Sequence, residues 1–149
     1  MNNTHILPPT YLLIAIVLMI VLHFLVPLVK VISFPWNLLG LLPFGAGCVL
    51  NACADRAFKK VGTTVKPFQE PTTLITDGVF RLTRHPMYVG FVLILLGIAI
   101  FVGSMTPYLV VVAFPFLLEK IFIQVEERML EETFGETWLT YKQKVRRWI

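Results

Sequence analysis

The sequence predicts an all-α integral membrane protein that forms a single domain over residues 1–149. Three observations favour this class. Hydrophobic residues make up 56% of the chain and charged residues only 15%, whereas a soluble domain contains about 25% charged residues. Separate apolar runs each approach the ~20 residues that a helix needs to cross a bilayer. The charged residues are concentrated between these runs and after the last one.

We predict about four transmembrane helices, over residues 11–31, 34–54, 86–102 and 107–123. Trp36 begins the second run at the depth of the membrane interface. The same run carries Gly40, Gly45 and Gly47, small residues that allow a neighbouring helix to approach closely. The third and fourth runs form a helical hairpin, because glycine and proline make a tight turn between them.

Two polar segments complete the chain, a cytoplasmic loop over residues 55–85 and a C-terminal segment over 124–149. Asp77 and Gly78 indicate a turn in the loop. The C-terminal segment combines glutamates with apolar side chains in a pattern typical of an amphipathic helix. Gly135 is expected to end one helix there and to begin another.

The basic residues predict the orientation in the membrane. Of the 13 lysines and arginines, all but Lys30 lie in the 55–85 loop or at and beyond the end of the fourth run. Segments with such an excess of basic residues face the cytoplasm. Two predicted spans separate the loop from the C-terminal segment, which places both on one side. The sequence therefore predicts a multi-pass protein with both termini in the cytoplasm.

Charge and residue spacing limit the expected partners. The net charge of +4 is borne beside apolar runs, so anionic lipid headgroups are the expected partner and nucleic acid is not. His5, His23 and His85 are scattered, and Cys48 and Cys53 have no zinc-ligand spacing. The two cysteines also lie on different faces of one predicted helix. We therefore expect neither a metal site nor a disulfide.

The most chemically distinctive stretch is 78–90, which places Arg84 and His85 directly before an apolar run. Pro86 favours a helix start, because proline suits the first helical turn. The unpaired N–H groups and partial positive charge of a helix start attract carboxylates and phosphates. This pattern indicates an anion-binding site. The alternative is that these cations face lipid headgroups at the interface.

A second polar pair, Glu126 and Glu127, directly follows the fourth run. Adjacent carboxylates at a membrane surface are unfavourable unless they are paired or solvated. One interpretation is a solvated helix start with Lys120 and Arg128 as partners. The other is that the glutamates face the arginine–histidine pair, because the hairpin brings both clusters to the same side of the membrane.

These motifs resemble those of the isoprenylcysteine carboxyl methyltransferase and phospholipid methyltransferase superfamily of integral membrane enzymes. The resemblance covers about residues 72–148. Its residues are Arg84, His85, Pro86, Tyr88 and Gly90, then Glu126, Glu127, Leu130, Phe134 and Gly135, then Tyr141 and Val145. It implies an enzyme that uses S-adenosylmethionine and releases S-adenosylhomocysteine, acting on a membrane lipid or lipid-like acceptor. It also implies that the loop and the C-terminal helix form the cofactor site.

The resemblance further implies residue roles. The expected cofactor-binding residues are Thr72, Thr73, Leu74, Ile75, Phe80, His85, Pro86, Met87, Tyr88, Glu126 and Glu127. The expected catalytic residues are Arg84, His85 and Glu127. The cofactor carboxylate suits the helix start, and a glutamate suits its ammonium group or ribose hydroxyls. Aromatic rings at positions 80 and 88 suit the adenine or the sulfonium cation.

One position departs from the isoprenylcysteine enzymes, which place an arginine four residues before the first glutamate to hold the substrate carboxylate. Phe122 stands there in this chain, and we expect its ring to line an apolar slot between the fourth helix and the C-terminal helix. The acceptor thus stays open between a prenylcysteine carboxylate and a phospholipid amine. A non-enzymatic scaffold that binds headgroups explains the basic residues, but not the presence of both motifs.

Overall fold

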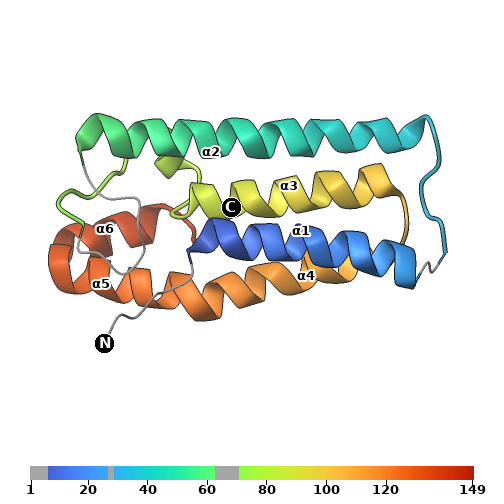
Figure 1. Cartoon of the computed structure of the whole chain (residues 1–149). Helices are drawn as coiled ribbons and strands as arrows, with labels where there is room; N and C mark the ends of the chain where they lie inside the picture. The colour runs from blue at the N-terminus through green and yellow to red at the C-terminus, as the bar shows by residue number, and fades with distance from the viewer. Residues whose placement is uncertain (1–6, 27–28, 63–70) are drawn as a thin grey trace.

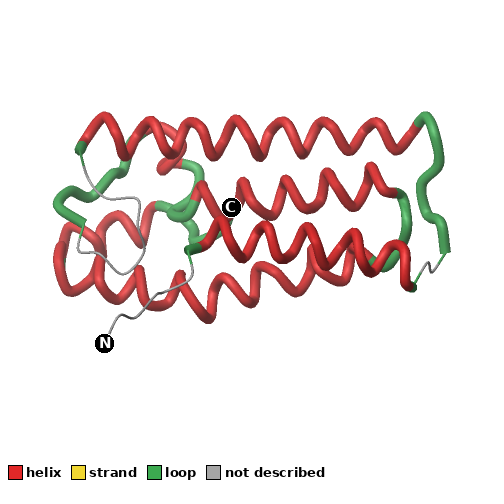
Figure 2. The backbone as a smooth tube through the Cα atoms, viewed as in Figure 1, coloured by secondary structure: helices red, strands yellow, loops and turns green. Residues whose placement is uncertain are grey.

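The computed structural model describes residues 7–26, 29–62 and 71–149, which form an elongated helical bundle (Figure 1). Its elements are α1 (Pro8–Leu25), η1 (Trp36–Gly40), α2 (Leu41–Val61), η2 (Gly78–Arg81), α3 (Pro86–Val102), α4 (Pro107–Leu118), η3 (Glu119–Ile123), α5 (Gln124–Phe134) and α6 (Glu136–Lys144). The described part of the chain consists of helices and loops, and α4, η3 and α5 follow one another as one continuous helix (Figure 2). The only bridge recorded there is an isolated one between Lys30 and Ser104. The predicted all-α class is confirmed.

The central helix is α3. It packs against α2 on one side and against α1 and α4 on the other, while α5 and α6 fold beyond its N-terminal end (Figure 1). The core combines Met19 of α1, Leu95 and Ala99 of α3, and Phe114 and Leu118 of α4. The start of α3 therefore lies at the end of the bundle where α5 and α6 are found.

The third predicted helix agrees with α3, whereas the first and fourth have different ends. α1 begins at Pro8, because proline suits the first helical turn, and it ends at Leu25 rather than at residue 31. α4 does not stop near residue 123 but continues through η3 and α5 to Phe134. No glycine or proline interrupts 116–134. Gly135, with φ +47°, then separates α5 from α6 as predicted.

The second predicted helix is longer than expected, since α2 ends at Val61 rather than at residue 54. The polar residues at its end support the additional turns. Lys59 Nζ lies 2.6 Å from the Asp55 carboxylate at the i,i+4 spacing, which stabilises a helix. The connection therefore begins at Gly62, in a left-handed conformation with φ +69°. Part of the predicted loop, 63–70, lies outside the described residues.

Three helical stretches are long and apolar enough to cross a bilayer, namely Pro8–Leu25, Trp36–Val61 and Pro107–Phe134. α3 is also apolar but has only 17 residues. Large apolar side chains such as Leu13, Phe24 and Leu42 are exposed. Extensive apolar exposure is typical of a surface that contacts lipid tails rather than water. These features define an integral membrane protein.

Glycines let α2 and α3 pack backbone to backbone. A Cβ atom at Gly40 would lie 2.4 Å from the carbonyl oxygen of Gly97, and one at Gly47 would lie 2.5 Å from that of Gly90. These separations are too short for a real Cβ atom, so the close helix approach that we predicted depends on glycine at both positions. The prediction is wrong for Gly45, because a Cβ atom there would meet open space.

Candidate active site

One turn of π-helix, η3, orients the glutamate pair. Leu118 and Glu127 are nine residues apart, which is about two and a half turns of a regular α-helix and would place them on opposite faces. The π-helical turn η3 contains one residue more than an α-helical turn. It therefore reduces the angle around the helix axis between the Leu118 and Glu127 side chains. Both side chains are consequently buried in the bundle.

The end of the chain holds the segment before α3 in place. The Thr83 hydroxyl donates a hydrogen bond to the carbonyl of Arg147 at 2.9 Å, and the Arg84 N–H donates to the carbonyl of Arg146 at 3.1 Å. The His85 N–H donates to Thr83 Oγ1 at 3.2 Å. These bonds hold the backbone of residues 83–85 directly before α3, which begins with a proline as predicted.

The Glu127 carboxylate is the centre of a charged cluster. Its Oε1 atom lies 3.2 Å from Arg84 Nη2 and 3.3 Å from His85 Nε2. Arg147 donates from Nε to Oε1 at 3.2 Å and from Nη2 to Oε2 at 2.7 Å. Its Nη1 also donates to Glu119 at 2.5 Å. The two predicted clusters are therefore in direct contact, and Arg147 joins them although we did not predict it as a site residue.

Glu126 is held by fewer protein groups than Glu127. The Tyr88 hydroxyl donates to Glu126 Oε1 at 2.5 Å, and His85 Nδ1 lies 3.5 Å from Oε2. The Glu126 side chain is 21% exposed, against 7% for Glu127, and it lines a cavity. Protein donors contact both oxygens of the Glu127 carboxylate. The Glu126 carboxylate has fewer protein donors and can accept a further hydrogen bond from a group in the cavity.

His85 lies between the two carboxylates. Burial lowers the pKa of His85, but hydrogen bonds to Glu126 and Glu127 and the charges of both glutamates outweigh it and raise the pKa above its ordinary value. The protonated form also balances the charge of the cluster, in which three cations face three carboxylates: His85, Arg84 and Arg147 with Glu119, Glu126 and Glu127.

A cavity of about 270 Å³ lies beside this cluster. Many of the predicted residues line it: Thr73, Leu74, Phe80, Arg84, His85, Pro86, Met87, Tyr88 and Glu126. Thr72, Ile75 and Glu127 are not part of its wall. The predicted cofactor residues are thus mostly brought together at one cavity, while Glu127 reaches it only through His85 and Arg84.

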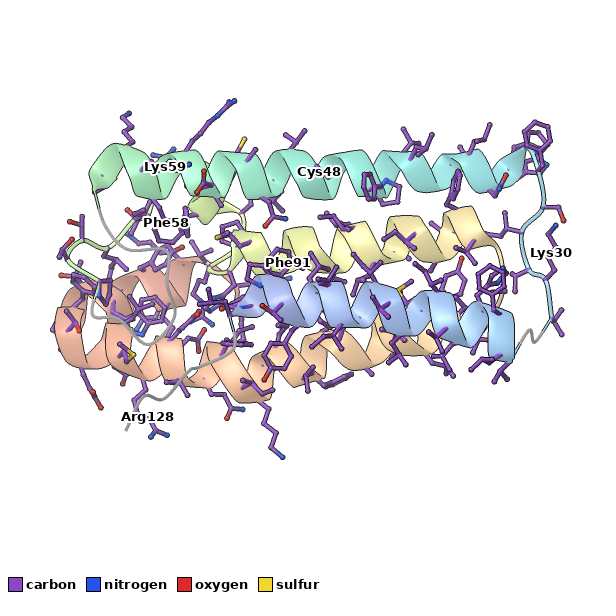
Figure 3. The ribbon with its side chains drawn as sticks, viewed as in Figure 1. Lys30, Cys48, Phe58, Lys59, Phe91 and Arg128 are labelled. Atoms are coloured by element: carbon purple, nitrogen blue, oxygen red, sulfur yellow. The ribbon has the colours of Figure 1, made fainter. Side chains whose placement is uncertain are left out.

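The cavity wall also contains residues that we did not predict to bind a ligand. Phe58 projects from α2 into this end of the bundle (Figure 3) and packs edge-on against Phe80, with ring centroids 5.5 Å apart. Trp138 and Tyr141 come from α6, and the Tyr141 hydroxyl donates to the carbonyl of Phe80 at 2.6 Å. The motif and the amphipathic pattern pointed to the α6 residues. Phe58 had no such signal, because we assigned it to the loop.

Three buried donors at the cavity have no partner among the described residues. They are Nε and Nη1 of Arg84 and Nε1 of Trp138. The guanidinium carbon of Arg84 lies 5.6 Å from the ring centroid of Trp138, and both residues line the cavity. Buried donors without acceptors are rare because they are unfavourable. This corner of the cavity is therefore suited to an anionic group such as a carboxylate.

Phe122 does not line this cavity. Its side chain is 1% exposed, and its ring packs edge-on against Tyr11 at 5.3 Å and lies 6.2 Å from the Tyr88 ring. The predicted slot between the fourth helix and the C-terminal helix is therefore wrong for this residue. The π-turn instead places Phe122 in the core, between α1 and α3.

The described residues contain no group of three His, Cys, Asp or Glu side chains that could hold a metal ion. Cys48 and Cys53 are free cysteines. The polar side chains that line the cavity include His85, Arg84 and Glu126, and aromatic rings surround them.

Fold and site together define a helical integral membrane protein with a charged cluster and a cavity at one end of its bundle. The sequence profile of the phospholipid methyltransferase family matches residues 36–137, which is more than half of the chain. The chain belongs to this family.

Named relatives are isoprenylcysteine methyltransferases. The protein-S-isoprenylcysteine O-methyltransferase of Schizosaccharomyces pombe is 37% identical over 75 residues, covering 48% of this chain and 30% of that protein. The one from Saccharomyces cerevisiae is 35% identical over 95 residues, covering 62% and 38%. A solved eukaryotic intramembrane Ras methyltransferase, an isoprenylcysteine carboxyl methyltransferase, superposes with a TM-score of 0.63 at 25% identity. That match covers 100% of this chain and 53% of the solved chain.

Proposed function

We propose that this protein transfers a methyl group from S-adenosylmethionine to a hydrophobic or amphipathic acceptor, in the manner of the isoprenylcysteine carboxyl methyltransferases. The observation that carries the proposal is the meeting of the arginine–histidine pair and the glutamate pair beside one cavity. Family membership supports the reaction type. A scaffold that only binds headgroups has no need of buried, unpartnered donors at a cavity.

The cavity residues fit the charged end of the cofactor, whose methionine portion carries a carboxylate and an ammonium group. Arg84 and Trp138 offer the carboxylate buried donors that have no partner among the described residues. Glu126 offers a carboxylate to the ammonium group or to the ribose hydroxyls. Phe80 and Tyr88 present aromatic rings that suit the adenine or the sulfonium. We therefore assign the cofactor carboxylate to Arg84 and Trp138 rather than to the helix start alone.

The bound cofactor supplies an activated methyl group, so the protein's task is to align the acceptor and exclude water. Apolar residues such as Leu74, Met87 and Phe91 line the cavity and suit an oily acceptor. A carboxylate acceptor requires no base. An amine acceptor must lose a proton, and His85 can take it at Nδ1 in the fraction of molecules whose imidazole is neutral, when Glu126 is engaged by the ligand.

Turnover of methyl-labelled S-adenosylmethionine by the protein in lipid nanodiscs tests the proposal. The acceptors are a farnesylcysteine analogue and phosphatidylethanolamine. We expect transfer to a lipid-like acceptor. For an amine acceptor, which needs a base, His85→Ala should lose ~100-fold or more, whereas for a carboxylate acceptor the loss should reflect weaker cofactor binding. His23→Ala is the matched control, because His23 hydrogen-bonds Ser104 in another part of the bundle. Absence of both transfer and cofactor binding in the wild type would contradict the proposal.

A phospholipid amine is the second candidate acceptor, and Phe122 favours it. Because Phe122 lies in the core, that position supplies no cation for a substrate carboxylate. The family profile is also that of phospholipid methyltransferases. The same assay separates the two acceptors: faster methylation of phosphatidylethanolamine than of farnesylcysteine supports the amine.

We further propose that α1, α2, α3 and the α4–α5 helix all cross the membrane, with both termini cytoplasmic. The basic residues of the sequence support this orientation. The test is accessibility labelling of single cysteines in a background in which Cys48 and Cys53 are serines. Met105→Cys, at an exposed position after α3, and Gln143→Cys, on α6, should react from opposite sides. Labelling from one side would contradict the topology.

A further inference from the structure

We propose that Arg147 is a positioning residue for the reaction. By holding both oxygens of Glu127, it fixes the contact between Glu127 and Nε2 of His85 and leaves Nδ1 of His85 toward Glu126 and the cavity. The catalytic consequence rests on the proposed function. The positioning itself can be measured without turnover.

The guanidinium of Arg147 forms a bidentate ion pair with the Glu127 carboxylate, which we call the fork. Nε donates to one carboxylate oxygen and Nη2 to the other, at 3.2 and 2.7 Å, and such paired bonds hold a carboxylate in one orientation. Glu119 accepts from the remaining side of the guanidinium. The hydrogen bond to Glu127 raises the pKa of Arg147, which keeps the fork charged.

The backbone of Arg147 is anchored as firmly as its side chain. Its carbonyl accepts from the Thr83 hydroxyl, and the next residue, Trp148, packs against the core. Thr83 in turn accepts from the backbone N–H of His85. Arg147 therefore connects the segment before α3, the π-turn and α5. An isolated surface ion pair has no such connections and contributes little.

The orientation of Glu127 determines what His85 can do. Glu127 Oε1 faces Nε2 at 3.3 Å, so Nε2 carries a proton and Nδ1 becomes the acceptor when the ring is neutral. The groups that surround the ring are Arg84 before α3, Tyr88 on α3, and Glu126 and Glu127 on α5, with Arg147 and Glu119 behind Glu127. Without the Arg147 cation, less positive charge balances the Glu127 carboxylate. That carboxylate then stabilises the His85 imidazolium more strongly, so His85 stays protonated to higher pH.

The experiment follows the titration of His85 by NMR in a His5→Gln, His23→Gln background. The variants are Arg147→Gln, Arg147→Lys and the matched control Arg146→Gln. Arg146 is exposed, and the structure records no ion pair for its side chain in the described part of the chain. We expect the His85 midpoint to rise by about one pH unit in Arg147→Gln, and to stay near the wild-type value in Arg147→Lys and Arg146→Gln.

Turnover provides the second measurement. Arg147 does not line the cavity, so Arg147→Gln should lower kcat by ~10-fold while KM for the cofactor changes little. Arg147→Lys keeps the charge but loses the fork, and it should recover part of kcat. If Arg147→Gln does not fold, Arg147→Lys carries the test: a lowered kcat supports the proposal and an unchanged kcat overturns it.

An unchanged His85 midpoint in Arg147→Gln, or an equal shift in Arg146→Gln, would overturn the positioning role. Failure of the proposed function gives a different result. In that case the midpoint moves in Arg147→Gln as expected, but the wild type methylates no acceptor.

Discussion

The two ends of the bundle differ in the kind of polar contact that they contain. At the end that joins α1 to α2 and α3 to α4, polar side chains form neutral contacts. His23 Nδ1 lies 2.8 Å from Ser104 Oγ, and the Thr106 hydroxyl donates to the carbonyl of Val26 at 2.6 Å. The opposite end holds the charged cluster and the cavity. In Figure 3, Lys30 lies at the first end, and Phe58 and Arg128 lie toward the other.

The end of the bundle that holds the cavity is the one suited to a ligand. At one end the polar groups named above form neutral hydrogen bonds, and one buried acceptor, Asn37 Oδ1, has no partner there among the described residues. At the cavity, Arg84 and Trp138 keep buried donors that have no partner in the described part of the chain. Buried polar groups without partners are unfavourable for stability, so three such donors on two side chains that line one cavity, beside a perturbed histidine, indicate a binding site.

The largest expected effect is at the centre of the charged cluster. Glu127→Ala leaves Arg84 buried without its carboxylate, so it should lower the free energy of unfolding by ~3–5 kcal/mol and abolish methyl transfer. Thermal unfolding in detergent measures the first effect. Glu131→Ala is the control, because Glu131 pairs with Lys142 at the surface and its loss should change stability by less than ~1 kcal/mol. If Glu127→Ala and Glu131→Ala lowered the free energy of unfolding equally, Glu127 would not be the centre of a stabilising charged cluster.

Residues that face the cavity should affect binding. His85→Ala, Tyr88→Ala and Glu126→Ala should each weaken cofactor binding by ~1–3 kcal/mol, because each leaves a buried polar group unpaired. Calorimetry with the purified variants measures the change. If all three bind the cofactor as the wild type does, the site has been assigned to the wrong residues.

The raised pKa of His85 makes stability depend on pH. Because the pKa is higher in the folded than in the unfolded protein, the imidazolium stabilises the fold fully below the unfolded pKa of about 6.5. This contribution is lost as the pH rises through the folded pKa. The difference in melting temperature between wild type and His85→Gln should therefore be larger at pH 6 than well above the folded pKa. A difference that grows with pH would refute the assignment.

The smallest effect is expected at the neutral end. Ser104→Ala removes one hydrogen bond to His23 and should lower the free energy of unfolding by ~1 kcal/mol. Cofactor affinity should not change, because the neutral end does not contribute to the cavity. Calorimetry and thermal unfolding on this one variant test both statements, and a weakened affinity would show that the two ends are coupled.

Much of the architecture follows from local features of the sequence. The apolar runs predict the membrane class, Pro86 predicts the start of α3, and Gly135 predicts the break between α5 and α6. The tight hairpin also predicts that the glutamates meet the arginine–histidine pair. Each inference depends on residues that are close in sequence or on one short connection, and such signals are carried by composition, spacing and turn residues.

The tertiary structure decided which way the side chains face. The π-turn turns Phe122 into the core and Glu127 toward His85, and the sequence pattern did not indicate a widened turn. Phe58 reaches the site from α2, outside the motif, and Arg147 lies two residues after Val145 at a position that the motif does not specify. A helix turns by about 100° per residue, and one additional residue in a turn is therefore enough to exchange the side chains that face the cavity with those that face the core.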